Sequence, residues 1–341
     1  MTAFLVPAPP PGAAPLPAST GPVTMSAYLP AYQVAPYIGE SVGSLLAQTR
    51  PPLDIVVVDD GSTDDLEGAL APYRDRITLI HQPNRGAATA MNVGWRATRG
   101  EFAVLLDPDD RFLPGRFEAM AELAAARPDL DVLTTDALIE IDDVVTGRYY
   151  TATNRFETGD QRTGILRANF VFGHPAIRRT ALEAVGGFDE TLGSTFDWEC
   201  WIRLILAGSR VGLVDEALAV YRLRPGSLSS ARPRMLRGRV ATLSRTLDRS
   251  DLSVEERAVA TGSLAFVQRN LDLAESQRAL LEGAGDARRR ALAIARDGAH
   301  PWSSRAKAAL TVPAPKAAGA LLRKRARNRS RDPKAIRAAR E

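Results

Sequence analysis

The chain has 341 residues, and 45% of them are hydrophobic, so it is long enough to bury a large core. Its single cysteine, Cys200, excludes an internal disulfide, and its three histidines argue against a histidine-rich metal site. The apolar runs are too short for a transmembrane helix, and the proline-rich residues 7–22 do not resemble a secretory signal, so we expect a cytoplasmic protein.

The net charge of +4 is unevenly distributed along the chain. Residues 288–341 contain 16 Lys and Arg against 3 Asp and Glu, a net charge of +13, whereas residues 1–287 sum to −9. We expect this basic end to meet an anionic surface, such as the inner face of the cell membrane, to which the protein would bind peripherally. The only Phe, Tyr or Trp in this segment is Trp302, so we expect no nucleic acid partner.

Composition also predicts how the chain is divided. Residues 1–21 are rich in Pro and Ala, and we expect a disordered leader there. An α/β domain is predicted at 22–231, a helical extension at 232–300, and a basic tail interrupted by prolines at 301–341.

The first half of the α/β domain alternates strand and helix patterns. Strands are predicted at 23–29, 54–59, 77–81 and 102–106, and helices at 36–47, 64–73 and 86–97. This rhythm predicts a mostly parallel sheet flanked by helices. Ligands of such sheets bind beyond the carboxyl ends of the strands.

The second half of the domain is less regular. Strands are predicted at 130–135, 148–151, 211–214 and 218–223, and helices at 179–185 and 195–207. The segment 172–177 is predicted to lead into the first of these helices. From Arg232 to about Arg296 the pattern is helical.

Asp107-Pro108-Asp109 directly follows the strand predicted at 102–106. Two carboxylates at the end of a buried strand suit one Mg²⁺ or Mn²⁺ ion that keeps open positions for substrate phosphates. The alternative is a solvated acidic turn before the next helix, which is the commoner meaning of an isolated motif of this kind.

Two other polar groups lie at the ends of predicted elements. Asp59 and Asp60 end the strand at 54–59, where a carboxylate accepts a hydrogen bond from a base N–H or a ribose hydroxyl; the same segment also suits a helix cap. Arg85 precedes Gly86 at a helix start, and it lies either near a nucleotide or in an ordinary turn.

Asp197, Trp198 and Glu199 open the helix predicted at 195–207. An acid here acts either as a general base or as a partner of the helix dipole, and Trp198 belongs either to the core or to a sugar-stacking surface. Arg224, on a loop after the strand at 218–223, either neutralises a diphosphate or forms a surface turn.

Taken in order, these segments resemble glycosyltransferase family 2, which has the GT-A fold. The stretches that carry the resemblance are VTMSAYLPAY (23–32), GESVGSLLAQT (39–49), IVVVDDGSTD (55–64), NRGAATAMNVG (84–94), GEFAVLLDPDD (100–110), GGFDE (186–190), DWECWIR (197–203) and YRLRPGSLS (221–229). Each alone is a weak signal, but eight in the family's order are a strong one.

The resemblance implies a nucleotide site. Pro30, Tyr32 and Asp59 would line the pocket for the base and ribose, and Asp60 and Arg85 would lie close by.

It also implies roles on the metal and acceptor sides. Asp107 would contact the ribose or a metal, and Asp109 would hold the metal against the diphosphate. Asp197 matches the family's catalytic base, and Trp198 and Glu199 would shape the acceptor side.

The sequence departs from the family pattern at several positions. Gln33 stands where the family often has Asn, Met91 where an Arg often precedes Asn92, and Phe196 in place of a frequent acid before the base. Arg224 replaces a frequent His, and because an Arg does not bind a metal, we assign it to phosphate.

Together these features predict a metal-dependent, inverting, non-processive glycosyltransferase. The donor would be a nucleoside diphosphate sugar, with UDP favoured, the cofactor Mn²⁺ or Mg²⁺, and the acceptor a glycan or lipid-linked hydroxyl in cell-envelope or polysaccharide synthesis. The alternatives are a sugar-nucleotide nucleotidyltransferase and a non-catalytic homologue. The segment Pro30-Ala31-Tyr32 is not the glycine-rich phosphate loop that a nucleotidyltransferase needs, and no G-x-G-x-x-G follows the first strand, which argues against a dinucleotide oxidoreductase.

Overall fold

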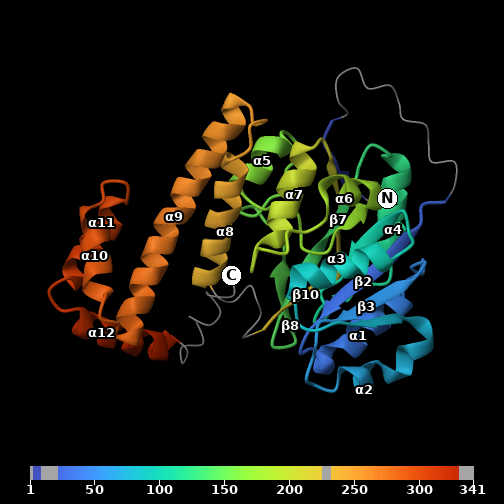
Figure 1. The fold of residues 1–341 in the computed structure, drawn as a ribbon, viewed down its shortest axis with the longest axis horizontal. Helices are drawn as coiled ribbons and strands as arrows, with labels where there is room; N and C mark the ends of the chain where they lie inside the picture. Colours follow the sequence, from blue (N-terminus) through green and yellow to red (C-terminus); the bar gives the residue numbers. More distant parts are fainter. Residues whose placement is uncertain (1–2, 9–21, 225–231, 330–341) are drawn as a thin grey trace. The chain divides into compact units, whose positions relative to one another are not determined.

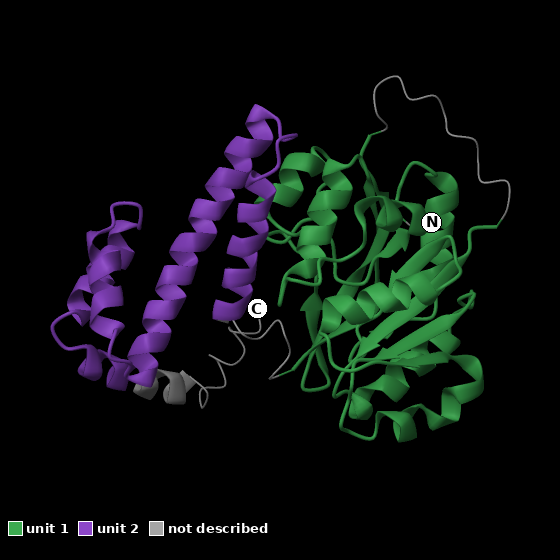
Figure 2. Ribbon diagram, viewed as in Figure 1, with its two compact units in different colours: residues 1–224 green, residues 225–341 purple. Residues whose placement is uncertain are grey.

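The computed structural model describes residues 3–8, 22–224 and 232–329. The chain divides into two compact units, residues 1–224 and residues 225–341 (Figure 2). The division falls just after the last strand, before the boundary at 231 predicted from composition.

Unit 1 is built on a ten-stranded sheet flanked by helices (Figure 1). Its strands run in the order β1-β10-β7-β9-β5-β2-β3-β4, with β6 paired to β10 and β8 paired to β7. The bounds are β1 (Phe4–Leu5), β2 (Met25–Ala31), β3 (Ile55–Asp59), β4 (Thr78–His81), β5 (Phe102–Leu105), β6 (Arg111–Phe112), β7 (Val132–Ile141), β8 (Val144–Arg148), β9 (Ala176–Arg178) and β10 (Val211–Leu223).

The helices of unit 1 connect these strands, and the predicted α/β fold is confirmed. They are α1 (Ala35–Leu46), α2 (Leu66–Leu70) continued by the 3₁₀ helix η1 (Ala71–Arg76), α3 (Ala87–Ala97), α4 (Arg116–Ala126), α5 (Gln161–Arg167), α6 (Arg179–Val185) and α7 (Phe196–Leu206). Every residue of β2, β3 and β5 is buried, as expected for parallel strands covered on both faces.

The sheet is parallel on one side and mixed on the other. Strands β5, β2, β3 and β4 are parallel neighbours, as the sequence predicts. Beyond β5 the sheet departs from the mostly parallel prediction, because β9 inserts antiparallel between β5 and β7. Val104 pairs with Ala176, so the residues just before β9 lie at the carboxyl end of β5.

The prediction of a disordered leader is wrong for residues 3–8. Phe4 pairs with Val214 as β1 adds antiparallel to the edge of β10, and the amide of Asp215 donates to the carbonyl of Ala3. An open strand edge offers unpaired backbone groups, and Phe4 and Val6 pack against the core there. The rest of the predicted leader, residues 9–21, lies outside the described residues.

Unit 2 is entirely helical in its described part. Its helices are α8 (Arg232–Leu247), α9 (Val254–Glu282), α10 (Ala287–Arg296), α11 (Trp302–Thr311) and α12 (Pro315–Arg329). Ser253 and Glu256 form a capping box at the start of α9, and Gly283, at φ +70°, ends it. The predicted basic tail contains two helices, α11 and α12, and so is largely helical in its described part. One of the prolines predicted to interrupt the tail lies between these helices.

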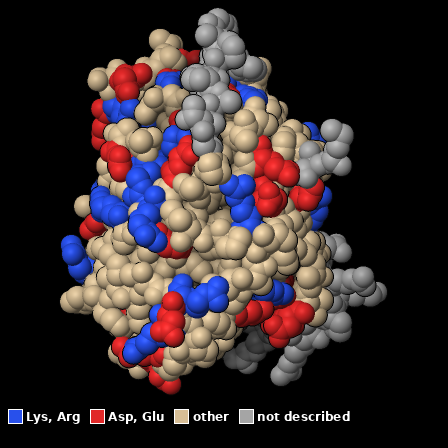
Figure 3. All heavy atoms as spheres, turned by 90° about the vertical axis from the view of Figure 1, so that its right-hand side faces the viewer, with Lys and Arg blue, Asp and Glu red and all other residues tan. Residues whose placement is uncertain are grey.

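Among the described helices, none is both long and apolar enough to cross a bilayer. On the face drawn in Figure 3, basic and acidic side chains are interspersed, with no large area of one sign.

Candidate functional site

The acidic loop after β5 is fixed in place by helix α1. The loop makes a tight turn, in which the amide of Asp110 donates a hydrogen bond of 3.0 Å to the carbonyl of Asp107. From α1, the hydroxyl of Ser41 reaches the carbonyls of Pro108 at 2.8 Å and Asp110 at 2.6 Å. These bonds fix the backbone that carries the carboxylates of this loop.

Asp107, Asp110 and His174 bring their side chains together at this loop. His174 Nε2 lies 2.9 Å from Asp110 Oδ2 and 3.4 Å from Asp107 Oδ2. His174 and Asp110 are each 1% exposed, whereas Asp107 is 37% exposed. Their donor atoms all lie within 4.8 Å of one another, the kind of group that could hold a metal ion.

Burial and the attraction between opposite charges both shift the pKa values of His174 and Asp110. Burial alone lowers the pKa of His174, but the carboxylates of Asp107 and Asp110 outweigh it and raise that pKa to about 9. Burial raises the pKa of the Asp110 carboxyl to about 6, although His174 opposes the rise. Each partner therefore stabilises the charged form of the other.

Asp109, the predicted metal ligand, faces two arginines from the end of β10. Arg224 Nε donates to Asp109 Oδ2 at 2.5 Å, and Arg222 Nη1 donates to the Asp109 carbonyl at 2.8 Å. The Arg222 side chain also bonds Glu140 and Glu40, and both guanidinium groups lie near the ring of Tyr37. The structure thus places Arg224 against the acidic loop, where a diphosphate would bring further negative charge.

Asp59 lies at the end of β3 with its carboxylate engaged by two neighbours. The amide of Ser62 donates to Oδ1 at 2.9 Å, and His81 Nδ1 lies 3.0 Å from Oδ2. Burial alone raises the pKa of Asp59, but the bonds from Ser62 and His81 hold it below its ordinary value.

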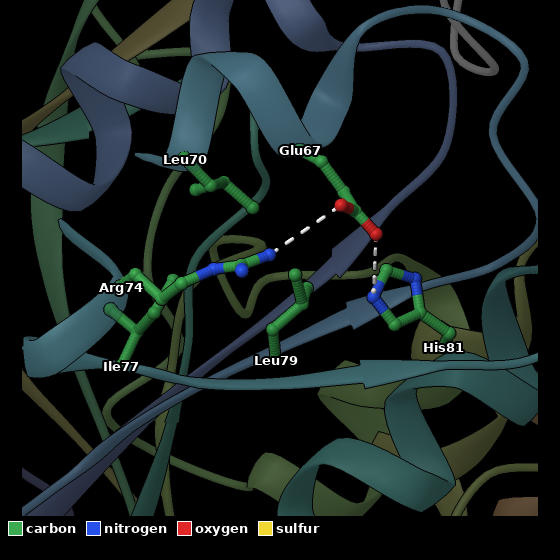
Figure 4. Close-up of a pocket in the computed structure, with 6 residues that line it drawn as sticks. All are labelled: Glu67, Leu70, Arg74, Ile77, Leu79 and His81. Atoms are coloured by element: carbon green, nitrogen blue, oxygen red, sulfur yellow. Dashed lines mark hydrogen bonds and ion pairs between the residues drawn. The ribbon is translucent and has the colours of Figure 1, made fainter. Parts of the chain in front are cut away.

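A surface pocket adjoins Asp59 through His81 (Figure 4). Its rim carries a chain of polar contacts, from His81 Nε2 to Glu67 at 3.2 Å and from Glu67 to Arg74 at 3.4 Å. The pocket is lined by Glu67, Leu70, Arg74, Ile77, Leu79 and His81.

Asp60 holds the loop that leads into α3. Its carboxylate accepts from the amides of Arg85 and Gly86, each at 2.8 Å, and from the Gln82 side chain at 2.7 Å. The Arg85 side chain is 63% exposed and lies 3.7 Å from Glu190. Asp60 therefore positions the loop that carries Arg85.

Pro30 lies near the end of the central strand β2, and Tyr32 directly follows that strand. Pro30 is buried opposite Val58, whereas Tyr32 is 48% exposed. Since β2 is flanked by β3 and β5, its end lies between Asp59 and Asp107. The two predicted acidic clusters thus meet at one edge of the sheet, as expected for a parallel sheet.

Asp197 lies in the first turn of α7, where its Oδ2 accepts from Asn169 at 3.3 Å. The residue before the helix, Thr195, has a φ of +61°, a conformation that is costly for a β-branched residue. Asn169 lies in the same loop as His174, so Asp197 and the acidic cluster are joined by one segment of chain.

Trp198 and Glu199 face the interior. Trp198 is 3% exposed and donates its indole N–H to the carbonyl of Ile165. Glu199 forms a two-pronged ion pair with Arg203, whose guanidinium also binds the Gly187 carbonyl. Both residues can affect an acceptor only through the backbone that they position.

Sequence reasoning missed His174, His81 and the role of Asp110. The available signal for His174 was its place just before a short apolar stretch that pairs with β5, but the antiparallel insertion of β9 is not visible in a periodicity. His81 closes β4 beside Asp59, and the parallel pairing of Asp59 with His81 is the feature that brings them together.

The sequence profile described as "Glycosyl transferase family 2" matches residues 26–186. With the fold and the carboxylates at the ends of β3 and β5, this shows that residues 26–186 form a glycosyltransferase family 2 domain with the GT-A fold.

Curated relatives are similar over the same region. The uncharacterized glycosyltransferase EpsJ of Bacillus subtilis is 31% identical over 220 residues, covering 60% of this chain and 62% of that protein. Glycosyltransferase GlyG of Streptococcus pneumoniae is 27% identical over 230 residues, covering 60% and 72%. The chain spans about three fifths of the length of the first curated relatives that it matches.

Solved structures share the fold at low sequence identity. Staphylococcus aureus TarS 1–349 in complex with UDP-GlcNAc is 20% identical, with a TM-score of 0.59 and coverage of 80% of each chain. Mannosyltransferase PcManGT from Pyrobaculum calidifontis, in complex with GDP-Man and Mn²⁺, is 20% identical, with a TM-score of 0.57 and coverage of 86% and 81%.

Proposed function

We propose that this protein transfers a sugar from a nucleoside diphosphate sugar to a hydroxyl group of a glycan or lipid-linked acceptor. The observation that carries the proposal is the meeting of Asp59 and Asp107 at the carboxyl ends of β3 and β5, on either side of β2. A nucleotidyltransferase is disfavoured, because the end of β2 is Pro30-Ala31-Tyr32 rather than a glycine-rich phosphate loop.

The donor side would be formed by the predicted residues around β2. Pro30, Tyr32 and Asp59 would bind the base and ribose, and Asp60 would act by holding the loop of Arg85. We favour UDP as the nucleotide. TarS has been solved with UDP-GlcNAc and PcManGT with GDP-Man, which supports a nucleoside diphosphate sugar as the class of donor.

A divalent cation, Mn²⁺ or Mg²⁺, would assist at the acidic loop, held by Asp107 and Asp109 as the sequence predicts. The residues present fit such an ion, because Asp107, Asp110 and His174 each offer a donor atom and these atoms lie within 4.8 Å of one another. The cation would neutralise the diphosphate as it leaves. Arg224 would add positive charge on the same side, after exchanging its contact with Asp109.

Asp197 would be the general base. It would take the proton of the acceptor hydroxyl while that oxygen bonds to the anomeric carbon and the bond to the diphosphate oxygen breaks. A single displacement of this kind inverts the anomeric configuration. Trp198 and Glu199 would keep the acceptor side in shape by their contacts with Ile165 and Arg203.

We also propose that unit 2 brings the protein to the inner face of the cell membrane, as a cytoplasmic, peripheral protein acting in cell-envelope or polysaccharide synthesis. On α11, Trp302 and Leu310 are each 80% exposed, and α12 is rich in Lys and Arg. Exposed apolar side chains beside basic residues suit an anionic lipid surface.

Calorimetry with UDP, in Mn²⁺ and then in EDTA, tests the metal-dependent donor site. We expect tight binding only with Mn²⁺, because Asp107, Asp109 and Asp110 repel a bare diphosphate. Asp109→Asn should weaken the Mn²⁺-dependent binding more than Asp107→Asn does. Equal affinity for UDP with Mn²⁺ and with EDTA would count against the proposed role of the cation.

A further inference from the structure

We infer that His81 is a positioning residue that sets the nucleobase preference of the donor site. It holds the Asp59 carboxylate in the orientation that accepts from a base with a ring N–H, such as uracil, and rejects a base without one, such as cytosine. This inference rests on the proposed function, because it names how the proposed donor site would choose its nucleotide. The sequence predicts a place for Asp59 in the base pocket but gives no role to His81.

The register of two neighbouring strands brings His81 beside Asp59. Strands β3 and β4 are parallel, and Asp59 pairs with His81 at their carboxyl ends. The amide of Gln82 donates to the Asp59 carbonyl at 2.9 Å, which continues the pairing one residue further. Because side chains alternate between the two faces of a sheet, residues paired across a parallel ladder share a face. The backbone alone therefore places the imidazole next to the carboxylate.

The two oxygens of Asp59 are held by different neighbours. His81 Nδ1 lies 3.0 Å from Oδ2, and the amide of Ser62 donates to Oδ1 at 2.9 Å. Burial raises the pKa of Asp59, but these two contacts outweigh it and hold that pKa below its ordinary value, so the carboxylate is ionised at neutral pH. An ionised carboxylate has about four acceptor sites, and it is 11% exposed here, so it can still accept from a ligand.

The imidazole is held from its other side by helix α2. His81 Nε2 lies 3.2 Å from one oxygen of Glu67, and Arg74 lies 3.4 Å from the other oxygen (Figure 4). The side chains of His81 and Glu67 are 48% and 59% exposed, so this ion pair contributes little to the stability of the fold. Its effect is to orient the ring, with Nδ1 directed at Asp59.

A carboxylate fixed in this way distinguishes bases by their hydrogen-bond donors. Uracil has a ring N–H between its two carbonyl groups, whereas the same ring nitrogen of cytosine carries no hydrogen and is an acceptor. A site built to receive an N–H rejects an analogue that lacks it, because acceptor then faces acceptor. A carboxylate that is free to rotate can instead accept from the exocyclic amino group of cytosine. The preference therefore depends on the bond from His81 and not only on the charge of Asp59.

Calorimetry of UDP and CDP binding to the whole chain in Mn²⁺ tests the inference. Wild-type protein should bind UDP about tenfold or more tightly than CDP, and in His81→Leu this ratio should fall to about threefold or less. His81→Asn is the matched variant, because its side-chain amide lies about where Nδ1 lies and can donate to Asp59. It should keep the ratio within about twofold of the wild type, although it also loses the contact with Glu67.

His81→Gln tests the inference even if the leucine variant fails to fold. Its longer side chain reaches Glu67 rather than Asp59, so the ratio should fall as in His81→Leu. Equal losses of UDP and CDP affinity in these two variants, or an unchanged ratio, would make His81 a purely structural residue and overturn the inference. Equal affinity of the wild type for UDP and CDP would overturn it and leave the proposed function intact. No binding of either nucleotide would overturn the proposed donor site as well.

Discussion

At the scale of single residues, the carboxylates of this domain divide into two kinds that look alike in the sequence. Asp60 accepts three hydrogen bonds from its own chain, and Glu199 is held by Arg203. Asp107 remains 37% exposed at the strand end. Some of these acids are paired within the protein, and others are exposed to a ligand. The difference depends on the residues that the fold brings opposite each acid, so the sequence predicts where the acids lie but not which of them are paired.

Asp197→Asn is expected to lower the rate of sugar transfer by about 10²–10⁴-fold, the usual contribution of a positioned general base. The amide keeps the shape of the side chain and its contact with Asn169, so UDP affinity and melting temperature should change little. Transfer rate, UDP affinity and thermal unfolding are measured on the same preparation.

Glu199→Gln is the control for that experiment. It should lower the free energy of unfolding by about 1–3 kcal/mol, since it weakens the largely buried pair with Arg203. A folded Asp197→Asn protein with near-normal transfer would refute the base assignment, and a large loss of rate confined to Glu199→Gln would move the base there.

The ionisation of Glu140 is expected to make the free energy of unfolding depend on pH. Hydrogen bonds from Arg111 lower the pKa of Glu140, against the effect of burial, and Arg222 adds to this. The ionised carboxylate therefore stabilises the folded state fully above the ordinary pKa of 4.5, and this stabilisation is lost as pH falls through the lower pKa of the folded state.

Urea unfolding at pH 7 and at pH 3.5 measures this effect. The free energy of unfolding of Glu140→Gln should fall less between the two pH values than that of the wild type. Glu118→Gln, at a carboxylate 48% exposed and 3.9 Å from Arg50, should behave as the wild type does. The same pH response in Glu140→Gln and wild type would contradict the role given to this ion pair.

At the scale of elements, the segment after α6 is fastened to α3 by polar contacts. Asn92 donates to the carbonyl of Phe188 and to Glu190, and its own oxygen accepts from the Phe188 amide. Gly187, at φ +79°, lies so close that a Cβ atom there would be 2.4 Å from Asn92 Oδ1. The contact explains why residue 187 is a glycine.

Gly187→Ala is therefore expected to destabilise unit 1 more than Gly186→Ala. Both positions have a φ of +79°, so both variants carry the cost of a left-handed alanine, about 1–2 kcal/mol. Only residue 187 adds the clash with Asn92, since a Cβ at 186 meets nothing within 4 Å. Chemical denaturation should show an extra loss of about 1–3 kcal/mol at 187; equal losses would contradict the contact.

At the scale of the whole molecule, the parallel half of the sheet could be predicted and the mixed half could not. Strands β2 to β5 alternate with helices at short spacing, and this pattern predicts that they are parallel. Strands β1 and β9 are two and three residues long, and they owe their positions to pairing with distant segments rather than to their own sequence. His174 was missed for the same reason.

The proposed membrane contact of unit 2 can be tested by substituting two of its exposed apolar side chains. Trp302→Ser and Leu310→Ser together should weaken binding to anionic liposomes by about tenfold or more, because both apolar side chains would lose burial in the lipid interface. Binding should also weaken as salt rises. Co-sedimentation measures both effects.

Phe266→Ser is the matched control, since Phe266 is 61% exposed but lies on α9, away from the basic helix in sequence. It should leave liposome binding unchanged. Binding that is insensitive to salt, or equal losses in all variants, would argue against a membrane surface formed by α11 and α12.

The central claim is that this chain breaks the bond between a sugar and a nucleoside diphosphate, and product analysis tests it most directly. The protein is incubated with a panel of UDP-sugars and Mn²⁺, and the released nucleotides are separated and identified. We expect nucleoside diphosphate to be released, at a rate that falls sharply in Asp107→Asn. Formation of nucleoside triphosphate when pyrophosphate is added, or no turnover with any nucleoside diphosphate sugar and acceptor glycan, would contradict the account.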